Sequence, residues 1–434
     1  MNAACKRMII GIDDTDSREG MCTTYLGALL MDELCAFGSP VCDPLLVRLN
    51  PTIPYKTRGN ASIALCFTFN APEKAIEHVV SRVSSLARME CENTNPGVVF
   101  ITEDDSVKAK PLLAAFFMRA VKDVITIDEA KSLAEELGLT FRTFKNGRGL
   151  IGALAACGAM LDKEWEHTYE FLTYRKSAVC GTKRLVDSGS LFEADLNTYP
   201  ETWDSVDRFN ELVVCVPRSP DPVLYGIRGN TRSAVEKAAG MVRSEEFERS
   251  CIYRTNQGTD MHLLPAKNVD EVREMHSYIL EGTVAAPAHT FRGGHSVFVL
   301  KDDTGKTIDC AAFEPTKNFR EVIRRLVSGD RVIVYGSVME NTLNIEKIRI
   351  LSLAPVFEIN NPICPSCGKR MKSAGLGQGY RCRKCATAAS EAEHIMLERN
   401  IMTGFYEVPP CARRHLAKPL IRFEHSEASL FPGR

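Results

Sequence analysis

Two pairs of cysteines near the C-terminus constrain the fold of this chain more than any other feature. Cys364 and Cys367 form one Cys-x2-Cys pair, Cys382 and Cys385 form a second, and 14 residues separate the two pairs. Four thiolates at this spacing bind Zn²⁺ tetrahedrally. Because the thiolates fill all four metal positions, we expect the zinc to be structural. The alternative is a pair of disulfides, which are rare in cytosolic proteins.

The zinc-binding segment and the residues after it are basic. Residues 361–434 contain twelve Lys and Arg against six Glu and no Asp, a charge of +6, so residues 1–360 carry −7 of a total of −1. This asymmetry indicates contact with a polyanion, although a solvated basic surface is the alternative. Basic side chains interleaved with aromatic ones bind RNA backbones and stack on bases. The expected RNA contacts are Lys369, Arg370, Arg381, Arg383, Lys384, Tyr406, Arg413, Arg414 and Lys418.

The length of 434 residues predicts about three or four domains, because it exceeds what one core supports. The longest nearly apolar run, 149–161, is too short to span a bilayer, and residues 1–7 lack the apolar core of a secretory signal. Cysteines such as Cys66, Cys157 and Cys215 are scattered through strand-like and helix-like segments. This pattern favours reduced thiols in a cytoplasmic protein without a membrane segment.

Three acids follow the first expected strand. Asp13, Asp14 and Asp16 come after the apolar run 8–12. Like charges this close repel unless a cation lies between them, and hard carboxylate oxygens suit Mg²⁺ that is shared with substrate phosphates. The alternative is an acidic loop that caps the next helix, which is expected to begin near Thr23.

A glycine turn precedes the apolar run. Gly147, Arg148 and Gly149 open into a small-residue helix, whose free N–H groups and positive dipole end could hold an anion. The sequence lacks the Gly-Lys-Ser/Thr of the common phosphate loops, and a tight turn before a closely packed helix is the alternative.

The apolar patterns predict mixed α/β and α+β architecture. Strands at 45–49, 61–69 and 98–102 alternate with helices, and residues 212–255 predict a β-β-α-β order (strands 212–216, 223–227 and 251–255, helix 231–242) typical of half a ferredoxin-like unit. Segment 276–355 predicts strands at 277–284, 296–301, 307–313, 331–338 and 343–351, with a helix at 319–326. This order is that of an oligonucleotide-binding (OB) barrel, although other small barrels share the strand count.

With these motifs in order, the chain resembles the archaeal 2-agmatinylcytidine synthetases, which modify the AUA-decoding isoleucine tRNA. The resemblance covers essentially the whole length. It rests on the segments 11–17, 20–26, 49–60, 147–154, 222–229, 259–262 and 405–416 and on the zinc cysteines. A few extra N-terminal residues and an acidic-apolar end after Arg422 depart from the pattern without touching a motif.

The resemblance implies four domains. These are a kinase-like α/β domain interrupted in sequence (1–60 and 110–195), a ferredoxin-like α+β domain (61–109 and 196–270), an OB-fold (271–357), and a zinc ribbon with a basic tail (358–434).

The resemblance also implies ATP-dependent joining of agmatine to C2 of the wobble cytidine, so that the tRNA reads AUA instead of AUG. The expected partners are agmatine and the anticodon loop and acceptor region of an isoleucine tRNA, and the expected cofactors are ATP, Mg²⁺ and structural Zn²⁺. Asp13, Asp14 and Asp16 would hold Mg²⁺, and Thr23 is similar to the threonine that becomes autophosphorylated in the family. The ATP phosphates would contact Lys56, Arg58, Gly147, Arg148 and Gly149.

Agmatine is a dication and requires carboxylates or carbonyls, for which Asp204, Asp207 and Asp260 are candidates that the sequence does not separate. Two alternative functions stay open. One is RNA binding without catalysis, and the other is a kinase that acts on RNA or on itself without conjugating agmatine.

Overall fold

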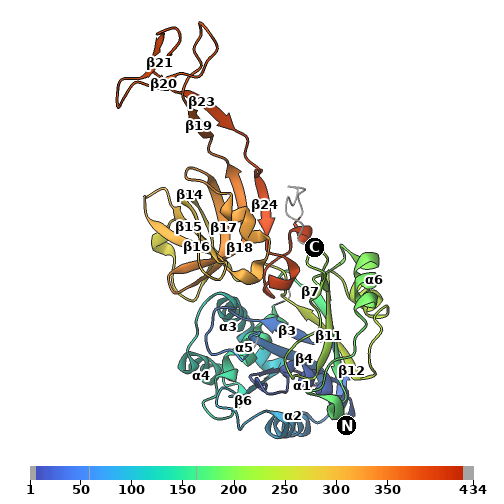
Figure 1. Cartoon of the computed structure of the whole chain (residues 1–434). Helices are drawn as coiled ribbons and strands as arrows, with labels where there is room; N and C mark the ends of the chain where they lie inside the picture. Colours follow the sequence, from blue (N-terminus) through green and yellow to red (C-terminus); the bar gives the residue numbers. More distant parts are fainter. Residues whose placement is uncertain (1–5, 58, 163, 424–434) are drawn as a thin grey trace.

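The computed structural model describes residues 6–57, 59–162 and 164–423. Figure 1 shows a broad lower part that contains the N-terminus, a barrel above it, and a narrow arm that projects from the barrel. No helix in the described part of the chain is long and apolar enough to cross a membrane.

One mixed sheet of ten strands organises the lower part. Its order is β6(Thr140–Thr143), β5(Gly97–Thr102), β1(Lys6–Asp13), β4(Ala61–Phe69), β3(Leu45–Arg48), β12(Phe247–Thr255), β7(Thr168–Arg175), β11(Val223–Gly229) and β8(Thr202–Trp203), with β2(Gly38–Pro40) beside β4. Residues 1–60 and 61–109 are expected above in different domains. In the structure, β1 is hydrogen-bonded to β4 and to β5, so these segments share one sheet.

Strand β1 separates two hydrophobic cores. Met8, Ile10 and Ile12 belong to the core that contains residues of α1(Thr23–Glu33) and α2(Pro72–Leu86). Ile9 belongs to the opposite core, with residues of α3(Glu103–Lys122), α4(Ile127–Glu136) and α5(Gly149–Leu161). Because side chains alternate across a strand, an apolar run without polar interruption fits a strand covered on both faces.

The second half of the lower part contains the expected β11, α7(Arg232–Ala239) and β12. The first expected strand, 212–216, is shorter than predicted, because β10(Leu212–Val213) pairs only with β9(Val206–Asp207), outside the large sheet. The N–H groups of Val214 and Cys215 both donate to Ser205 O, which ends the ladder. α6(Ser188–Thr198) packs against α7.

The barrel confirms the predicted OB order. β14(Ser277–Thr290), β15(Ser296–Lys301), β16(Thr307–Ala312), β17(Arg331–Met339) and β18(Thr342–Ser352) close through β14–β17 and β16–β18 pairing, and α8(Phe319–Arg324) lies between β16 and β17 in sequence. β13(Leu263–Ala266) runs parallel to β14.

The zinc-binding segment is carried on the arm as an excursion from the barrel. β19(Val356–Asn360) and β23(Glu393–Leu397) form a two-stranded ladder, beyond which lie β20(Lys372–Ser373), β21(Tyr380–Arg381) and β22(Ala388–Ala389) (Figure 1). The chain then returns, because β24(Gly404–Glu407) pairs with β18. Residues 404–423, which we call the tail, continue from the barrel to the lower part.

Candidate active site

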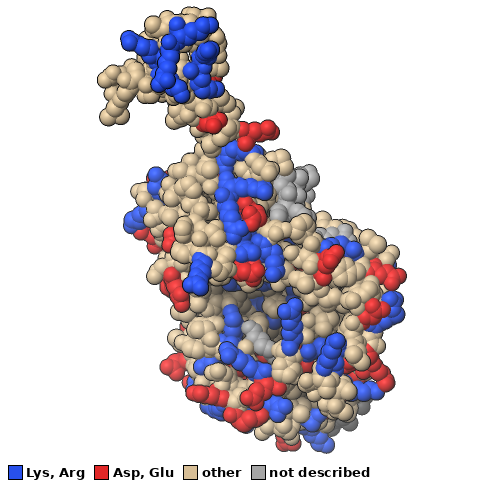
Figure 2. All heavy atoms as spheres, in the orientation of Figure 1, with Lys and Arg blue, Asp and Glu red and all other residues tan. Residues whose placement is uncertain are grey.

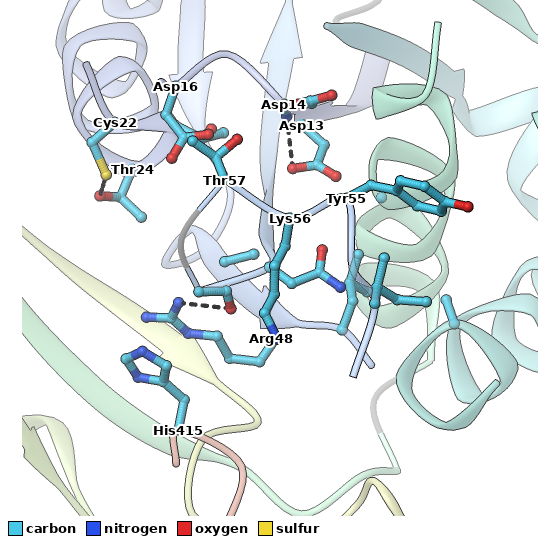
Figure 3. Close-up of a pocket in the computed structure, with 18 of the residues that line it drawn as sticks. Asp13, Asp14, Asp16, Cys22, Thr24, Arg48, Tyr55, Lys56, Thr57 and His415 are labelled. Carbon is cyan, nitrogen blue, oxygen red and sulfur yellow. Dashed lines mark hydrogen bonds between the residues drawn. The ribbon is translucent and has the colours of Figure 1, made fainter. Parts of the chain in front are cut away.

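A cavity of about 700 Å³ opens among the lower sheet, the loop after β3 and the tail. Its volume is in the range of small-molecule sites. Figure 2 shows basic side chains around a hollow below the barrel. In Figure 3, the three acids lie on one side of the cavity, Arg48 and His415 lie on the other, and Lys56 lies between them.

The end of β1 delivers the acids, and the structure brings all three to the cavity. Burial, followed by repulsion from Asp14, raises the pKa of Asp13 well above its usual value. Burial and Asp16 raise the pKa of Asp14 to about 7, against the opposing effects of the Asn95 N–H and Arg148. Two negative groups with raised pKa values and a third beside them form the donor set that a divalent cation compensates.

Helix α5 approaches the acids closely because its residues are small. A Cβ on Gly152 would lie 1.9 Å from Asp13 Oδ2, and one on Gly11 would lie 2.2 Å from Ala153 O. Only glycine fits at these contacts.

The turn before α5 contributes a side chain rather than a backbone cradle. Gly147 has φ 76°, and the N–H groups of Gly149 and Leu150 donate to Asn95 O and Gly147 O. Arg148 N donates to Asn146 Oδ1. The N–H groups expected to bind phosphate therefore have partners within the chain, which favours the tight-turn alternative. Only the Arg148 side chain lines the cavity, with its guanidinium 4.5 Å from the Tyr55 ring centre.

Thr23 is the first residue of α1, whereas the cap position belongs to Cys22, and neither side chain caps the helix. The Thr23 hydroxyl accepts a hydrogen bond from Thr15 Oγ1 at 3.0 Å and lines the cavity beside the acids. This placement does not support the capping alternative for Thr23.

Three further cations line the cavity. Lys56 follows β3, and burial, then Arg414, lowers its pKa. Arg48 and Arg228 lie across from the acids, where Glu170 Oε1 is 3.1 Å from Arg228 Nε. Arg58, expected to bind phosphate, lies outside the described residues.

The three carboxylates expected to bind agmatine have different surroundings. Asp204 lines the cavity but forms a buried ion pair with Arg413. Asp207 is buried and accepts from Asn210 Nδ2 at 2.9 Å, and Asp260 accepts from Lys347 Nζ at 2.7 Å. Neither of the last two is among the cavity residues.

Four cavity residues are not predicted from the sequence: Arg48, Glu170, Arg228 and His415. Arg228 and His415 occur in the segments 222–229 and 405–416 that carry the family resemblance. Glu170 lies in an ordinary strand pattern, so no sequence signal indicated it.

The four cysteines of the arm form the expected metal centre. Their Sγ atoms all lie within 4.8 Å of one another, and Cys367 Sγ is 3.6 Å from Cys382 Sγ. Zn–S bonds of about 2.3 Å in a tetrahedron place the sulfurs about 3.8 Å apart, so the cluster fits zinc.

The expected RNA contacts divide into two groups. The basic residues of the arm are exposed, and Figure 2 shows them gathered at its tip: Lys369, Arg370, Arg381, Arg383 and Lys384.

The expected contacts of the tail are mostly engaged within the protein. Tyr406 is buried, and its hydroxyl donates to Met402 O. The Arg413 side chain is 2% exposed and paired with Asp204 and Glu407, while Lys418 pairs with Glu166. Only Arg414, with 38% of its side chain exposed, has much accessible surface. Packing of the tail against the lower part, which composition does not reveal, accounts for the difference.

Sequence models of four domain families match the chain. They are the TiaS TCKD domain over 9–146, the TiaS FLD domain over 147–262, an OB-fold nucleic acid binding domain over 279–351, and the TiaS C-terminal zinc ribbon domain over 361–401. The first two are contiguous, in contrast to the interleaved division expected above.

Relatives and solved structures match along nearly the whole chain. The tRNA 2-agmatinylcytidine synthetase TiaS of Methanosarcina mazei, named for the second isoleucine tRNA, is 61% identical over 98% of this chain and 100% of its own length. That of Archaeoglobus fulgidus is 46% identical over 98% and 100%. The crystal structure of TiaS with that tRNA and ATP is 46% identical, covers 97% of this chain and 99% of that one, and has a TM-score of 0.90. A complex of TiaS with the tRNA, AMPCPP and agmatine is 43% identical, covers 97% and 98%, and has a TM-score of 0.87. The chain belongs to the TiaS family of isoleucine tRNA 2-agmatinylcytidine synthetases.

Proposed function

We propose that this chain is an ATP-dependent ligase that joins agmatine to C2 of the wobble cytidine of an isoleucine tRNA, in the cytoplasm. The observation that carries the proposal is the cavity, which has three acids on one side and Arg48, Lys56 and Arg228 on the other. Such a site can hold a metal-bound polyphosphate between opposite charges.

The chemistry explains why the enzyme needs ATP. The C2 carbonyl of cytosine is urea-like, a weak electrophile with a very poor oxide leaving group. Transfer of a phosphoryl group to O2 converts that oxygen into a phosphate leaving group. The primary amine of agmatine then attacks C2, the C2–O2 bond breaks, phosphate leaves and the amine gives up a proton. ATP ends as AMP.

Asp13, Asp14 and Asp16 would hold Mg²⁺, because the raised pKa values of Asp13 and Asp14 indicate uncompensated negative charge. When bound, Mg²⁺ neutralises phosphate charge. The chain's own Lys56 and Arg148 bind and orient the phosphates beside it. Thr23, whose hydroxyl faces the acid loop, is the side chain placed to accept a phosphoryl group.

Among the three carboxylates considered for agmatine, Asp204 is the one that lines the cavity. Asp207 and Asp260 support the surrounding structure through Asn210 and Lys347. The exposed basic side chains of the arm supply phosphate contacts for the tRNA, and the zinc stabilises the small fold that presents them.

Radiolabelled agmatine, ATP and two isoleucine tRNA transcripts test the proposal. One transcript carries the wobble cytidine, and the other carries uridine there. We expect label in the first transcript only, with AMP as the nucleotide product. A protein that only binds RNA leaves ATP intact, and a kinase without conjugation yields ADP and leaves agmatine free.

A further inference from the structure

The tail forms one wall of the cavity, although it follows the zinc arm in sequence. His415 and Leu416 are joined to the lower part by backbone hydrogen bonds, from Gly258 N to His415 O at 2.8 Å and from Thr259 N to Leu416 O at 3.1 Å. The imidazole of His415 lines the cavity together with Arg48 and Lys56 (Figure 3).

The contacts of His415 decide which ring nitrogen carries hydrogen. Arg228 Nη2 lies 2.7 Å from Nδ1, and a guanidinium can only donate. Gln257 Oε1 is 3.0 Å from the same nitrogen, since the Gln257 amide nitrogen donates to Glu170 Oε2 at 2.6 Å. A charged donor forms the stronger bond, so Nδ1 accepts from Arg228 and the hydrogen is on Nε2.

Nε2 faces the loop after β3, where a Cβ on Gly59 would lie 3.2 Å from it. Within the described part of the chain, no hydrogen bond of Nε2 is seen. Its N–H is therefore a donor available to the cavity.

The charges around the ring are mostly positive. Burial, followed by Arg48, Arg228 and Lys56, lowers the pKa of His415 well below its usual value. Glu170 is the carboxylate near them, 3.1 Å from Arg228 Nε and 3.9 Å from Arg48 Nη2. Three cations and one carboxylate leave net positive charge around a neutral imidazole, a combination that attracts an anion.

We propose that the Nε2–H of His415 donates a hydrogen bond to a phosphate oxygen of a substrate bound in the cavity, which makes the tail part of the phosphate-binding machinery. The inference rests on the proposed function for the identity of the substrates. Two of them carry phosphate, ATP and the tRNA.

Equilibrium binding separates the two sources without requiring the reaction. The Kd values of a non-hydrolysable ATP analogue, of adenosine and of isoleucine tRNA are measured for wild type, His415→Leu, His415→Gln and the control His289→Leu on the barrel. We expect His415→Leu to weaken the ATP analogue about 10- to 100-fold, as for a lost hydrogen bond to a charged group, and to leave adenosine unchanged. His415→Gln, whose amide N–H reaches the position of Nε2, should stay within about fivefold of wild type.

The pattern of affinities identifies the phosphate that His415 contacts. If His415→Leu weakens tRNA instead of the analogue, with His415→Gln again near wild type, the phosphate belongs to the RNA and the proposal stands. If neither affinity changes, or if Leu and Gln weaken binding equally, His415 has no phosphate contact and the proposal is overturned. Agmatine incorporation by wild type and His289→Leu is measured separately, and its absence would contradict the proposed function and not the role of His415.

Discussion

Arg413 of the tail and Asp204 of the lower sheet's β8–β9 connection form an ion pair in which both side chains are 2% exposed. Arg413 also reaches Glu407 Oε1 at 2.9 Å, so one guanidinium compensates two buried carboxylates. The pair fastens the tail to the cavity rim, because Asp204 is itself a cavity residue.

We predict that Arg413→Met destabilises the protein by about 3–5 kcal/mol, since removing one partner of a buried pair leaves an uncompensated charge. A shift of the urea midpoint measures this loss. Arg414→Met is the matched control, because its side chain is 38% exposed, and it should cost about 1 kcal/mol or less. Unchanged stability of Arg413→Met together with weaker tRNA binding would show that Arg413 contacts RNA directly.

Asp14→Asn should abolish agmatine conjugation and also stabilise the metal-free protein at pH 8. The folded-state pKa of Asp14, about 7, lies above the usual value, so protonation favours folding and the metal-free fold loses stability as the pH rises through about 7. Asparagine removes that charge and tolerates the φ of 59° at this position.

The melting temperature with and without Mg²⁺ provides the measurement, with Asp104→Asn on exposed helix α3 as control. Asp14→Asn should melt higher than wild type without metal and gain less from added Mg²⁺. Wild-type turnover at saturating Mg²⁺ would contradict the metal role.

Thr23→Val should remove activity far beyond the effect of a lost helix cap, which is roughly 0.5–2 kcal/mol of stability. Its hydroxyl faces Thr15 and the acid loop, and the helix has no side-chain cap to lose. Turnover and melting temperature are compared for Thr23→Val and Thr23→Ser. A folded, fully active valine variant would exclude a phosphoryl-acceptor role.

Two deletions should separate the arm from the tail. Replacing residues 361–392 by a short turn leaves β19 and β23 as a hairpin and should weaken tRNA binding and flatten its salt dependence, while the affinity for an ATP analogue is retained. Ending the chain after residue 360 also removes β24 and His415, and should lower the ATP-analogue affinity as well. Equal ATP-analogue affinity in both variants would show that the tail has no part in the cavity.

The junction between the barrel and the lower part should weaken in acid. Burial would raise the pKa of Glu346, but His262, Arg414 and Lys347 outweigh it and lower the pKa to about 2. A depressed folded-state pKa gives stability that is present above the usual value of 4.5 and is lost as the pH falls toward about 2, on the order of 3 kcal/mol.

Melting temperatures between about pH 6 and pH 3 test this for wild type and Glu346→Gln. The variant should be less stable near neutral pH and show a shallower acid dependence. Parallel curves for the two proteins would place the acid-sensitive group elsewhere.

Local patterns predicted much of the fold. The barrel strands and the apolar helix at 149–161 were predicted from side-chain alternation and composition, since such segments bury a defined face wherever they pack. The site was predicted in part, because the acids and Arg148 come from motifs that show in the local sequence. The Arg48, Glu170, Arg228 and His415 group was not predicted, because it joins four segments far apart in sequence. For the same reason no local pattern indicated that Arg413 and Tyr406 are buried.

The most direct test is mass spectrometry of the nucleosides of isoleucine tRNA after incubation with the full chain, ATP and agmatine. We predict that the wobble cytidine is replaced by 2-agmatinylcytidine with wild-type protein and stays unmodified with Asp14→Asn. Unmodified cytidine with folded, tRNA-bound wild-type protein would contradict the proposed function.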